Sequence, residues 1–241
     1  MPRKFNKLWV FGDSNCTPNF LVSPQDSFWG LAATQLGIER IVNVSRPGNS
    51  FVSIQHLVVS MQNQYDWQND LFLIGIPQLE RVTFFDQGKK TVYNASELDT
   101  SSWLCQQFEV PYHRGLINWS AFGGDRNAVM HESRSWTETE TLRNIYLLSQ
   151  WLRSHSAGYV IINLNKNFDK DNQWGPTEFL LPEMLNDPNC ILFEHSYRDC
   201  NIDVNYPPDF DLLQWEGHHG AAGNLHFYNV ALKPKLEELF C

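Results

Sequence analysis

The chain has 241 residues, and the 42% that are hydrophobic suffice for the core of one large domain or two small ones. Its 18 Lys and Arg against 27 Asp and Glu give a formal net charge of -9, which disfavours electrostatic attraction to nucleic acid or to an anionic membrane. We therefore expect neither partner, and without a bilayer-length apolar run or a signal-peptide pattern we expect a soluble, cytoplasmic protein.

An apolar run at residues 8–11 predicts a buried first strand that ends abruptly in Gly12, Asp13, Ser14 and Asn15. The glycine permits a sharp turn before the serine, and open α/β sheets bind their ligands at the carboxyl ends of strands. The same residues are also favoured in ordinary turns. This segment alone therefore leaves two interpretations open, a nucleophile loop and a plain turn.

The alternation of helix and strand continues with residues 28–37 and 41–44. The first range carries apolar residues at helical spacing and stops at Gly37, a common residue at helix C-termini. The second is a short β-branched strand that leads into a loop of turn residues at 45–50. One helix and a second strand are therefore expected here.

Residues 51–64 predict another helix, with Ser50 as its N-cap. Residues 71–76 are apolar throughout, as expected of a strand buried on both faces of a sheet. Strand, loop and helix in this order are typical of a parallel sheet covered by helices. The loops after its strands then lie on one edge.

A β-hairpin and an insertion are predicted next. Residues 82–85 and 91–93 flank a polar turn, as in a hairpin. Residues 94–135 show no sustained periodicity, only aromatic side chains among glycines and polar residues. We therefore expect an insertion at about residues 80–135, partly irregular, within a single domain that covers residues 1–241.

The second half of the chain predicts a long helix at residues 137–155, where Thr137 and Glu140 are spaced as in a capping box. A fourth strand is expected at 159–164. Three shorter elements follow: a helix at 177–185 interrupted near Pro182, a fifth strand at 191–193, and a final helix at 224–239 in which Pro234 is unfavourable. The fold class is therefore α/β, with three layers (α/β/α) around a mostly parallel five-stranded sheet.

A nucleophilic serine needs a base within hydrogen-bond reach and usually a carboxylate that holds the base in the right tautomer. The segment 216–224, Glu-Gly-His-His-Gly-Ala-Ala-Gly-Asn, holds the histidines with the most suitable neighbours. It lies between the last predicted strand and the last helix, on the same sheet edge as Ser14. For five of the other six histidines a structural or solvated role is favoured: His56, His131, His155, His195 and His226.

With Gly-Asp-Ser-Asn at 12–15, Pro-Gly-Asn-Ser at 47–50 and this late segment, the chain resembles the SGNH (GDSL-type) hydrolase superfamily. The resemblance implies a flavodoxin-like fold in which Ser14 is the nucleophile. It also implies that the backbone N–H groups of Ser14 and Gly48 form the oxyanion hole. In the family's last block an acidic residue shortly precedes the catalytic histidine, and a glycine follows five residues later. His218 and Gly223 fit that spacing, and Glu216 takes the acidic role.

Two alternatives stay open within the late segment. Glu216 and His219 reproduce the commoner spacing between acid and histidine, so His219 is the second candidate for the base. Asp211 is the second candidate for the acid. For Asp13 and Asn15 we expect a structural role, because short polar side chains beside such a turn commonly bond to the local backbone.

The third block departs from the family pattern. Where the family has Gly-x-Asn-Asp, this chain has Gly-Ile-Pro-Gln at 75–78, so the asparagine that supplies a side-chain oxyanion donor is absent. Losing one such donor costs on the order of a hundred- to a thousandfold in rate. Gln78 is a candidate substitute and Arg81 a source of nearby positive charge, and such variant blocks resemble those of phage-encoded and other outlying members.

The expected function is that of a serine esterase acting on an acyl ester, with an O-acetylated carbohydrate as the favoured substrate. Aromatic residues of the insertion would stack on sugar rings, and Asn49, Arg81 and Trp119 are the predicted substrate-binding residues. We expect no metal and no cofactor. Five scattered cysteines without a C-x-x-C spacing also argue against a zinc site or a disulfide framework: Cys16, Cys105, Cys190, Cys200 and Cys241.

Two other functions stay open from the sequence. One is a catalytically impaired SGNH module that binds glycans or serves in a virion, for which a virion-associated location would be expected. The missing third-block asparagine favours it. The other is an O-acyltransferase that uses the same serine.

Overall fold

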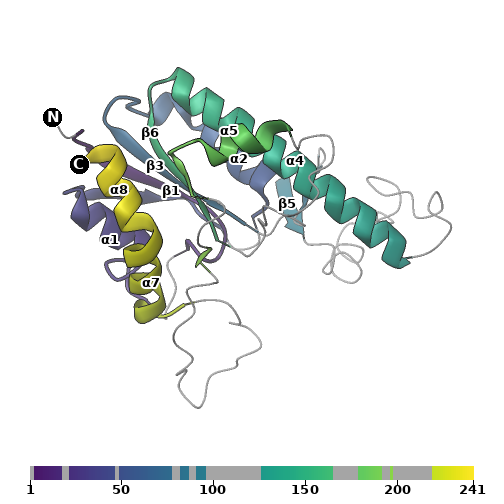
Figure 1. The fold of residues 1–241 in the computed structure, drawn as a ribbon, viewed down its shortest axis with the longest axis horizontal. Helices are drawn as coiled ribbons and strands as arrows, with labels where there is room; N and C mark the ends of the chain where they lie inside the picture. The colour runs from purple at the N-terminus through teal and green to yellow at the C-terminus, as the bar shows by residue number, and fades with distance from the viewer. Residues whose placement is uncertain are drawn as a thin grey trace, which may run out of the picture.

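The computed structural model of the chain describes residues 3–17, 22–46, 49–77, 82–86, 91–95, 126–164, 179–191, 196–197 and 219–241. Five strands in these ranges form one parallel sheet in the order β2-β1-β3-β6-β7 (Figure 1). The strands are β1 (Lys7–Phe11), β2 (Arg40–Asn43), β3 (Asp70–Ile76), β6 (Gly158–Asn163) and β7 (Cys190–Ile191). The predicted α/β class with its five-stranded parallel sheet is confirmed.

The strand order changes direction at β1, which pairs with β2 on one side and with β3 on the other. This is the 2-1-3-4-5 order of flavodoxin-like sheets. In open α/β sheets, ligands bind beyond the carboxyl ends of the strands at the point of reversal. The loop after β1, which carries Ser14, lies at that point.

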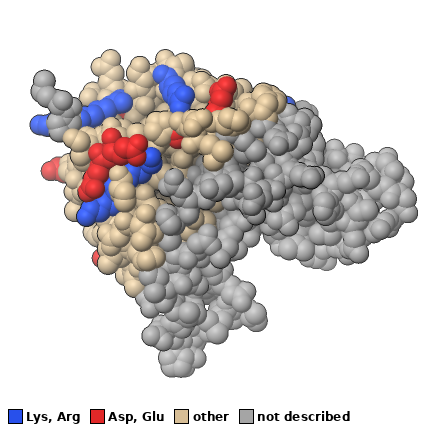
Figure 2. All heavy atoms as spheres, viewed as in Figure 1, with Lys and Arg blue, Asp and Glu red and all other residues tan. Residues whose placement is uncertain are grey.

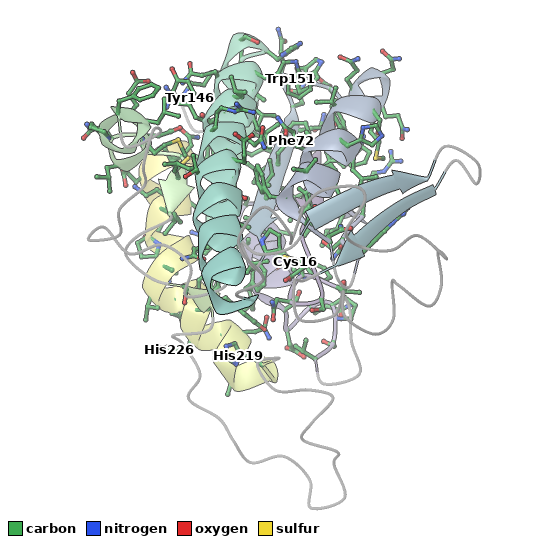
Figure 3. The ribbon with its side chains drawn as sticks, turned by 90° about the vertical axis from the view of Figure 1, so that its right-hand side faces the viewer. Cys16, Phe72, Tyr146, Trp151, His219 and His226 are labelled. Carbon is green, nitrogen blue, oxygen red and sulfur yellow. The ribbon has the colours of Figure 1, made fainter. Side chains whose placement is uncertain are left out.

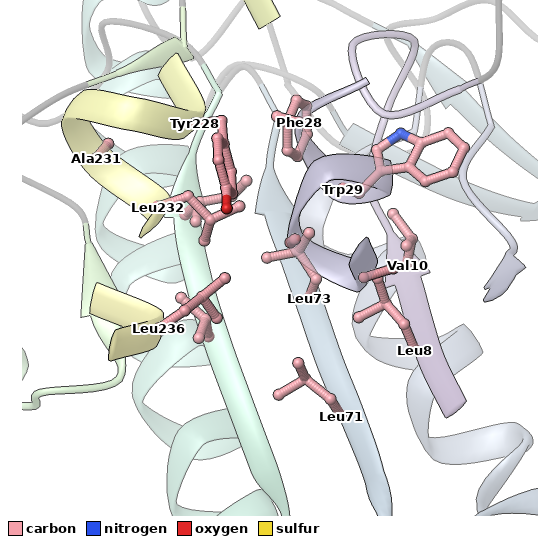
Figure 4. Close-up of a cluster of buried hydrophobic side chains, with 14 of the residues drawn as sticks. Leu8, Val10, Phe28, Trp29, Leu71, Leu73, Tyr228, Ala231, Leu232 and Leu236 are labelled. Carbon is pink, nitrogen blue, oxygen red and sulfur yellow. The ribbon is translucent and has the colours of Figure 1, made fainter. Parts of the chain in front are cut away.

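Helices cover both faces of the sheet (Figure 1). One face carries α1 (Phe28–Gln35), α7 (Ala221–Phe227) and α8 (Lys233–Phe240), and the other carries α2 (Phe51–Ser60), α4 (Arg126–Ser154) and α5 (Leu181–Leu185). Successive strand residues point to opposite faces, so Leu8 and Val10 pack toward α1 while Trp9 and Phe11 pack toward α2. In Figure 4, Leu8 and Val10 lie in the first of these two cores, in which Leu232 of the C-terminal segment is also buried.

The second core depends on Phe72, a fully buried side chain in the middle of β3. Its ring lies 4.8 Å from that of Tyr65 and 5.6 Å from that of Trp67, measured between centroids. We expect Phe72→Ala to lower the free energy of unfolding by about 3–5 kcal/mol, because lost burial and an unfilled cavity add. Urea unfolding would measure it. The matched change Val59→Ala, on a side chain 39% exposed, should cost less than about 0.5 kcal/mol; similar costs for both would contradict the assignment of this core.

The long helix begins earlier than predicted. α4 covers Arg126–Ser154, so Thr137 and Glu140 lie inside it, and their assignment as a capping box is wrong. Residues 126–135, predicted to be irregular, are helical. They lack an apolar stripe at helical spacing, yet no Gly or Pro interrupts the sequence between 126 and 157. The rest of the irregular insertion, residues 96–125, lies outside the described residues, and the single-domain division stays a prediction.

Both prolines that were expected to disturb helices are accommodated. Pro182 lies in the first turn of α5, where its missing N–H costs little, so it starts that helix rather than interrupting it. Pro234 lies likewise in the first turn of α8. It follows a π-helical stretch, Tyr228–Leu232, which joins α7 to α8. Pro234 has no N–H to donate to the carbonyl one turn earlier, and the helix is wider, with π-helical geometry, in the turn just before it.

Several local predictions are confirmed. The Ser50 side chain caps α2 by accepting from the N–H of Ser53 at 3.2 Å. Gly37 ends the first helix with a φ of 66°, a backbone conformation that favours glycine. β4 (Val82–Asp86) and β5 (Thr91–Ala95) form the antiparallel hairpin. None of the helices in the described ranges is long and apolar enough to cross a membrane.

Candidate active site

Ser14 lies in a tight turn directly after β1. The N–H of Cys16 donates to the carbonyl of Asp13 at 3.1 Å, which closes the turn around Ser14 and Asn15. Asp13 and Asn15 are buried, whereas Ser14 is partly exposed. The turn therefore leaves the serine more accessible than its two neighbours.

The carboxylate of Asp13 supports the turn from inside. Its Oδ1 accepts from the backbone N–H of Asn15 at 2.9 Å and from the Asn15 side-chain amide at 3.0 Å. The Thr17 hydroxyl donates to the Asp13 carbonyl at 3.0 Å. These bonds fit the structural role predicted for Asp13 and Asn15.

Cys16 fills the space beneath this turn. A Cβ at Gly12 would lie 2.4 Å from the Cys16 sulfur, and one at Gly75 would lie 2.9 Å from it. The absence of a Cβ at Gly12 and Gly75 therefore lets the ends of β1 and β3 approach the same sulfur. Burial raises the pKa of the Cys16 thiol well above its usual value, and the negative charge of Asp13 raises it further. The thiol stays protonated and fills space, so it does not compete with Ser14 as a nucleophile.

We expect Gly12→Ala to lower the free energy of unfolding by about 1–3 kcal/mol, because the added methyl group meets the Cys16 side chain. In a Cys16→Gly background the same change should cost at least about 1 kcal/mol less. A double-mutant cycle by urea unfolding measures this coupling. Equal costs in both backgrounds would show that the glycine is needed for another reason.

The loop after β2 is hydrogen-bonded to the serine turn. The N–H of Arg46 and the side-chain amide of Asn49 both donate to the carbonyl of Gly12, at 3.2 and 3.0 Å. The Asn43 amide donates to the carbonyl of Cys16 at 2.7 Å. The sequence assigns Asn49 to substrate binding, but its side chain is only 1% exposed and bridges the two loops, so a supporting role fits this geometry better.

His219 occupies a buried position before α7. Its side chain is 2% exposed, and its Nε2 lies 2.7 Å from the carbonyl oxygen of Tyr197. Because a carbonyl only accepts, Nε2 carries the proton and donates it in this bond. A Cβ at Gly223 would lie 2.7 Å from the Cβ of His219, so the glycine of this block makes room for that histidine.

Asn224 joins the histidine segment to the start of α1. Its Oδ1 accepts from the N–H of Phe28 at 3.0 Å, which satisfies a donor in the first helical turn. Its Nδ2 lies 3.1 Å from the Tyr197 hydroxyl, 3.1 Å from the His219 carbonyl and 3.0 Å from the Gly220 carbonyl. One buried amide thus fixes the backbone that directly follows His218.

The serine turn and His219 lie at the same end of the molecule. Figure 3 shows Cys16 and His219 there, far from Trp151. Burial raises the pKa of the Tyr197 hydroxyl, so this side chain stays neutral beside His219. Of the predicted site residues, the structure describes Ser14, Asn49 and His219, and it joins the loops of Ser14 and Asn49 by hydrogen bonds. The others lie outside the described residues: Gly48, Gln78, Arg81, Trp119, Asp211, Glu216 and His218.

Sequence reasoning gave no role to Tyr197 or Asn224. Asn224 stands next to Gly223 in the late segment, and this position was its only signal. Tyr197 has no sequence signal, because its partners are brought to it only by the fold. Tyr197 binds the His219 side chain, and Asn224 binds the backbone carbonyls of residues 219 and 220.

No protein-family model and no curated protein sequence matches this chain. Among solved structures, TesA is 13% identical, with 98% of this chain and 100% of TesA covered and a TM-score of 0.49. The psychrotrophic esterase EstA from Pseudoalteromonas sp. is 11% identical, with 96% and 99% covered and a TM-score of 0.47. The acetyl xylan esterase Est2A from the rumen bacterium Butyrivibrio proteoclasticus is 13% identical, with 99% of this chain and 65% of Est2A covered and a TM-score of 0.49.

Similarities this low leave function to be argued from the site itself. In the described part of the chain, no three His, Cys, Asp or Glu side chains gather as they would around a metal ion. On the face shown in Figure 2, basic and acidic side chains of the described residues lie among one another. The expectations about cofactors, nucleic acid and membranes stay predictions.

Proposed function

We propose that this protein is a serine esterase of the SGNH type. The observation that carries the proposal is the placement of Ser14, partly exposed in a buried, hydrogen-bonded turn at the carboxyl end of β1. That turn lies where the strand order reverses, at the same end of the molecule as His219. A hydroxyl held in this way is positioned to attack a bound ester.

In the proposed reaction, Ser14 Oγ bonds to the ester carbonyl carbon while His218 takes the hydroxyl proton. The backbone N–H groups of Ser14 and Gly48 stabilise the oxyanion, with Gln78 as a third donor. The tetrahedral intermediate then collapses, and the leaving alcohol takes the proton from His218. Water attacks the acyl-enzyme with His218 again as base, which releases the acid and restores Ser14.

His218 is the proposed base because His219 already has a structural task. The Nε2 of His219 donates to a backbone carbonyl, and its other ring nitrogen, Nδ1, would lie 3.3 Å from a Cβ at Gly223, so it packs against the start of α7. Glu216 is the proposed orienting acid, and Asp211 remains the alternative. The bonds of Asn224 to the carbonyls of residues 219 and 220 would hold the adjacent His218 in place.

An acetyl ester of a carbohydrate is the proposed substrate. The chain contains nine tryptophans, and Trp119 in the insertion would stack on a sugar ring, with Arg81 beside the ester. Turnover of p-nitrophenyl acetate and of an acetylated xylo-oligosaccharide tests this, together with fluorophosphonate labelling mapped by mass spectrometry. We expect a single label on Ser14 and acetate release from both substrates. Intact protein that neither labels nor hydrolyses an ester would favour the binding module, and acetyl transfer to an added sugar exceeding release to water would favour the acyltransferase.

A further inference from the structure

One side chain links the serine turn to the loop after β2. The Nδ2 of Asn49 donates to the carbonyl of Gly12 at 3.0 Å, and its Oδ1 accepts from the Ser53 hydroxyl at 3.4 Å. Asn49 is 1% exposed and Ser53 is 6% exposed. The amide therefore connects the end of β1, through its own loop, to the first turn of α2.

The side-chain amide of Asn49 suits this place because it can donate one bond and accept the other. The carbonyl of Gly12 also accepts from the N–H of Arg46 at 3.2 Å, a backbone bond that most residues at position 46 would supply. To bond to both the Gly12 carbonyl and the Ser53 hydroxyl, the side chain at position 49 must donate at one end and accept at the other. An ionised aspartate lacks the donor, and an alanine lacks both ends.

We propose that Asn49 is a positioning residue, which holds the Ser14 turn at a fixed distance from the loop that carries Gly48. The inference rests on the proposed function, in which the N–H groups of Ser14 and Gly48 bind one oxyanion. Such donors must lie about 2.7–3.1 Å from the developing oxygen, and a displacement of about 1 Å can cost a hundredfold in rate. Asn49 joins the two loops through the residue two positions before Ser14.

A positioning role for Asn49 predicts different effects on kcat and on KM. The oxyanion forms only in the transition state, so a displaced donor lowers kcat and leaves KM nearly unchanged. A side chain that contacts the substrate in its ground state would instead change KM. The split therefore distinguishes positioning by Asn49 from the substrate contact assigned to it by sequence.

The test is a comparison of Asn49→Ala, Ser53→Ala and Asn189→Ala in p-nitrophenyl acetate hydrolysis. Asn189 is the matched control, because its side-chain amide donates to the Tyr159 carbonyl at 2.7 Å at the amino end of the sheet, away from Ser14. We expect kcat to fall about 10- to 100-fold for Asn49→Ala, with KM within about twofold. Ser53→Ala, a milder change, should lower kcat by a smaller factor, and Asn189→Ala should leave it within about twofold.

The melting temperature of each variant separates loss of fold from loss of rate. If Asn49→Ala does not fold, the ranking of Ser53→Ala against Asn189→Ala decides the question. Equal kcat in the Asn49 and Asn189 variants, or a rise in KM alone, would overturn the inference while leaving the esterase intact. If Ser14→Ala keeps wild-type turnover, the proposed function fails, and the positioning role fails with it.

Discussion

The substitution Ser14→Ala should lower p-nitrophenyl acetate hydrolysis by at least about a thousandfold and abolish fluorophosphonate labelling. No other hydroxyl occupies the turn that closes between Asp13 and Cys16, and the buried thiol beneath it stays protonated. The fold should be little affected, because Ser14 is partly exposed and its turn is held by Asp13. We expect the free energy of unfolding to change by less than about 0.5 kcal/mol.

A serine elsewhere controls for the chemistry of the substitution itself. Ser60 lies exposed at the end of α2 and donates only within its own helix, to the Leu57 carbonyl at 3.0 Å. Ser60→Ala should keep wild-type turnover and labelling. Retention of both by Ser14→Ala as well would place the nucleophile elsewhere and end the esterase proposal.

The second large effect separates the two adjacent histidines. His218→Ala should reduce turnover by about a thousandfold or more, because the serine loses its base, while the melting temperature stays close to that of the wild type. His219→Ala should do the reverse. It removes the donor to the Tyr197 carbonyl and leaves that buried oxygen without it, at a cost of about 1–3 kcal/mol in unfolding free energy.

Activity and thermal unfolding must be measured on the same preparations, well below the lower melting temperature. His219→Gln serves as a matched control, because its side chain can still donate and should recover part of the lost stability. A loss of turnover in His219→Ala at full stability, with His218→Ala active, would exchange the roles of the two residues. Retained turnover in both variants would reject a histidine base in this segment.

Much of the fold could be predicted because it depends on short, local patterns. Apolar runs predicted β1 and β3. The chemistry of single residues predicted that Ser50 caps α2 and that Gly37 ends the first helix. The start of α4 was missed because residues 126–136 carry no apolar stripe, so propensity rather than periodicity defines that part. The two prolines were misjudged because their effect depends on their place in a helix, which the sequence pattern does not fix within a turn.

The candidate site could likewise be predicted only where it depends on local sequence. The position of Ser14 followed from the glycine and the strand before it. The supporting bonds did not, because they join residues far apart in sequence, such as Asn49 to Gly12 and Asn224 to Phe28. In the sequence alone, nothing distinguishes such a buried asparagine from an asparagine on the surface, because its partner is distant along the chain.

The hydrogen bond between Asn224 and Phe28 can form only after nearly the whole chain has been synthesised. It joins residues 196 apart, and the core beside it combines β1 and α1 with α7 and α8. During synthesis, the apolar face of α1 therefore stays uncovered until α7 and α8, near the end of the chain, have been made. The early half of the domain is then exposed to aggregation and to chaperones. The joining of α7 and α8 to β1 and α1 should therefore come late in folding.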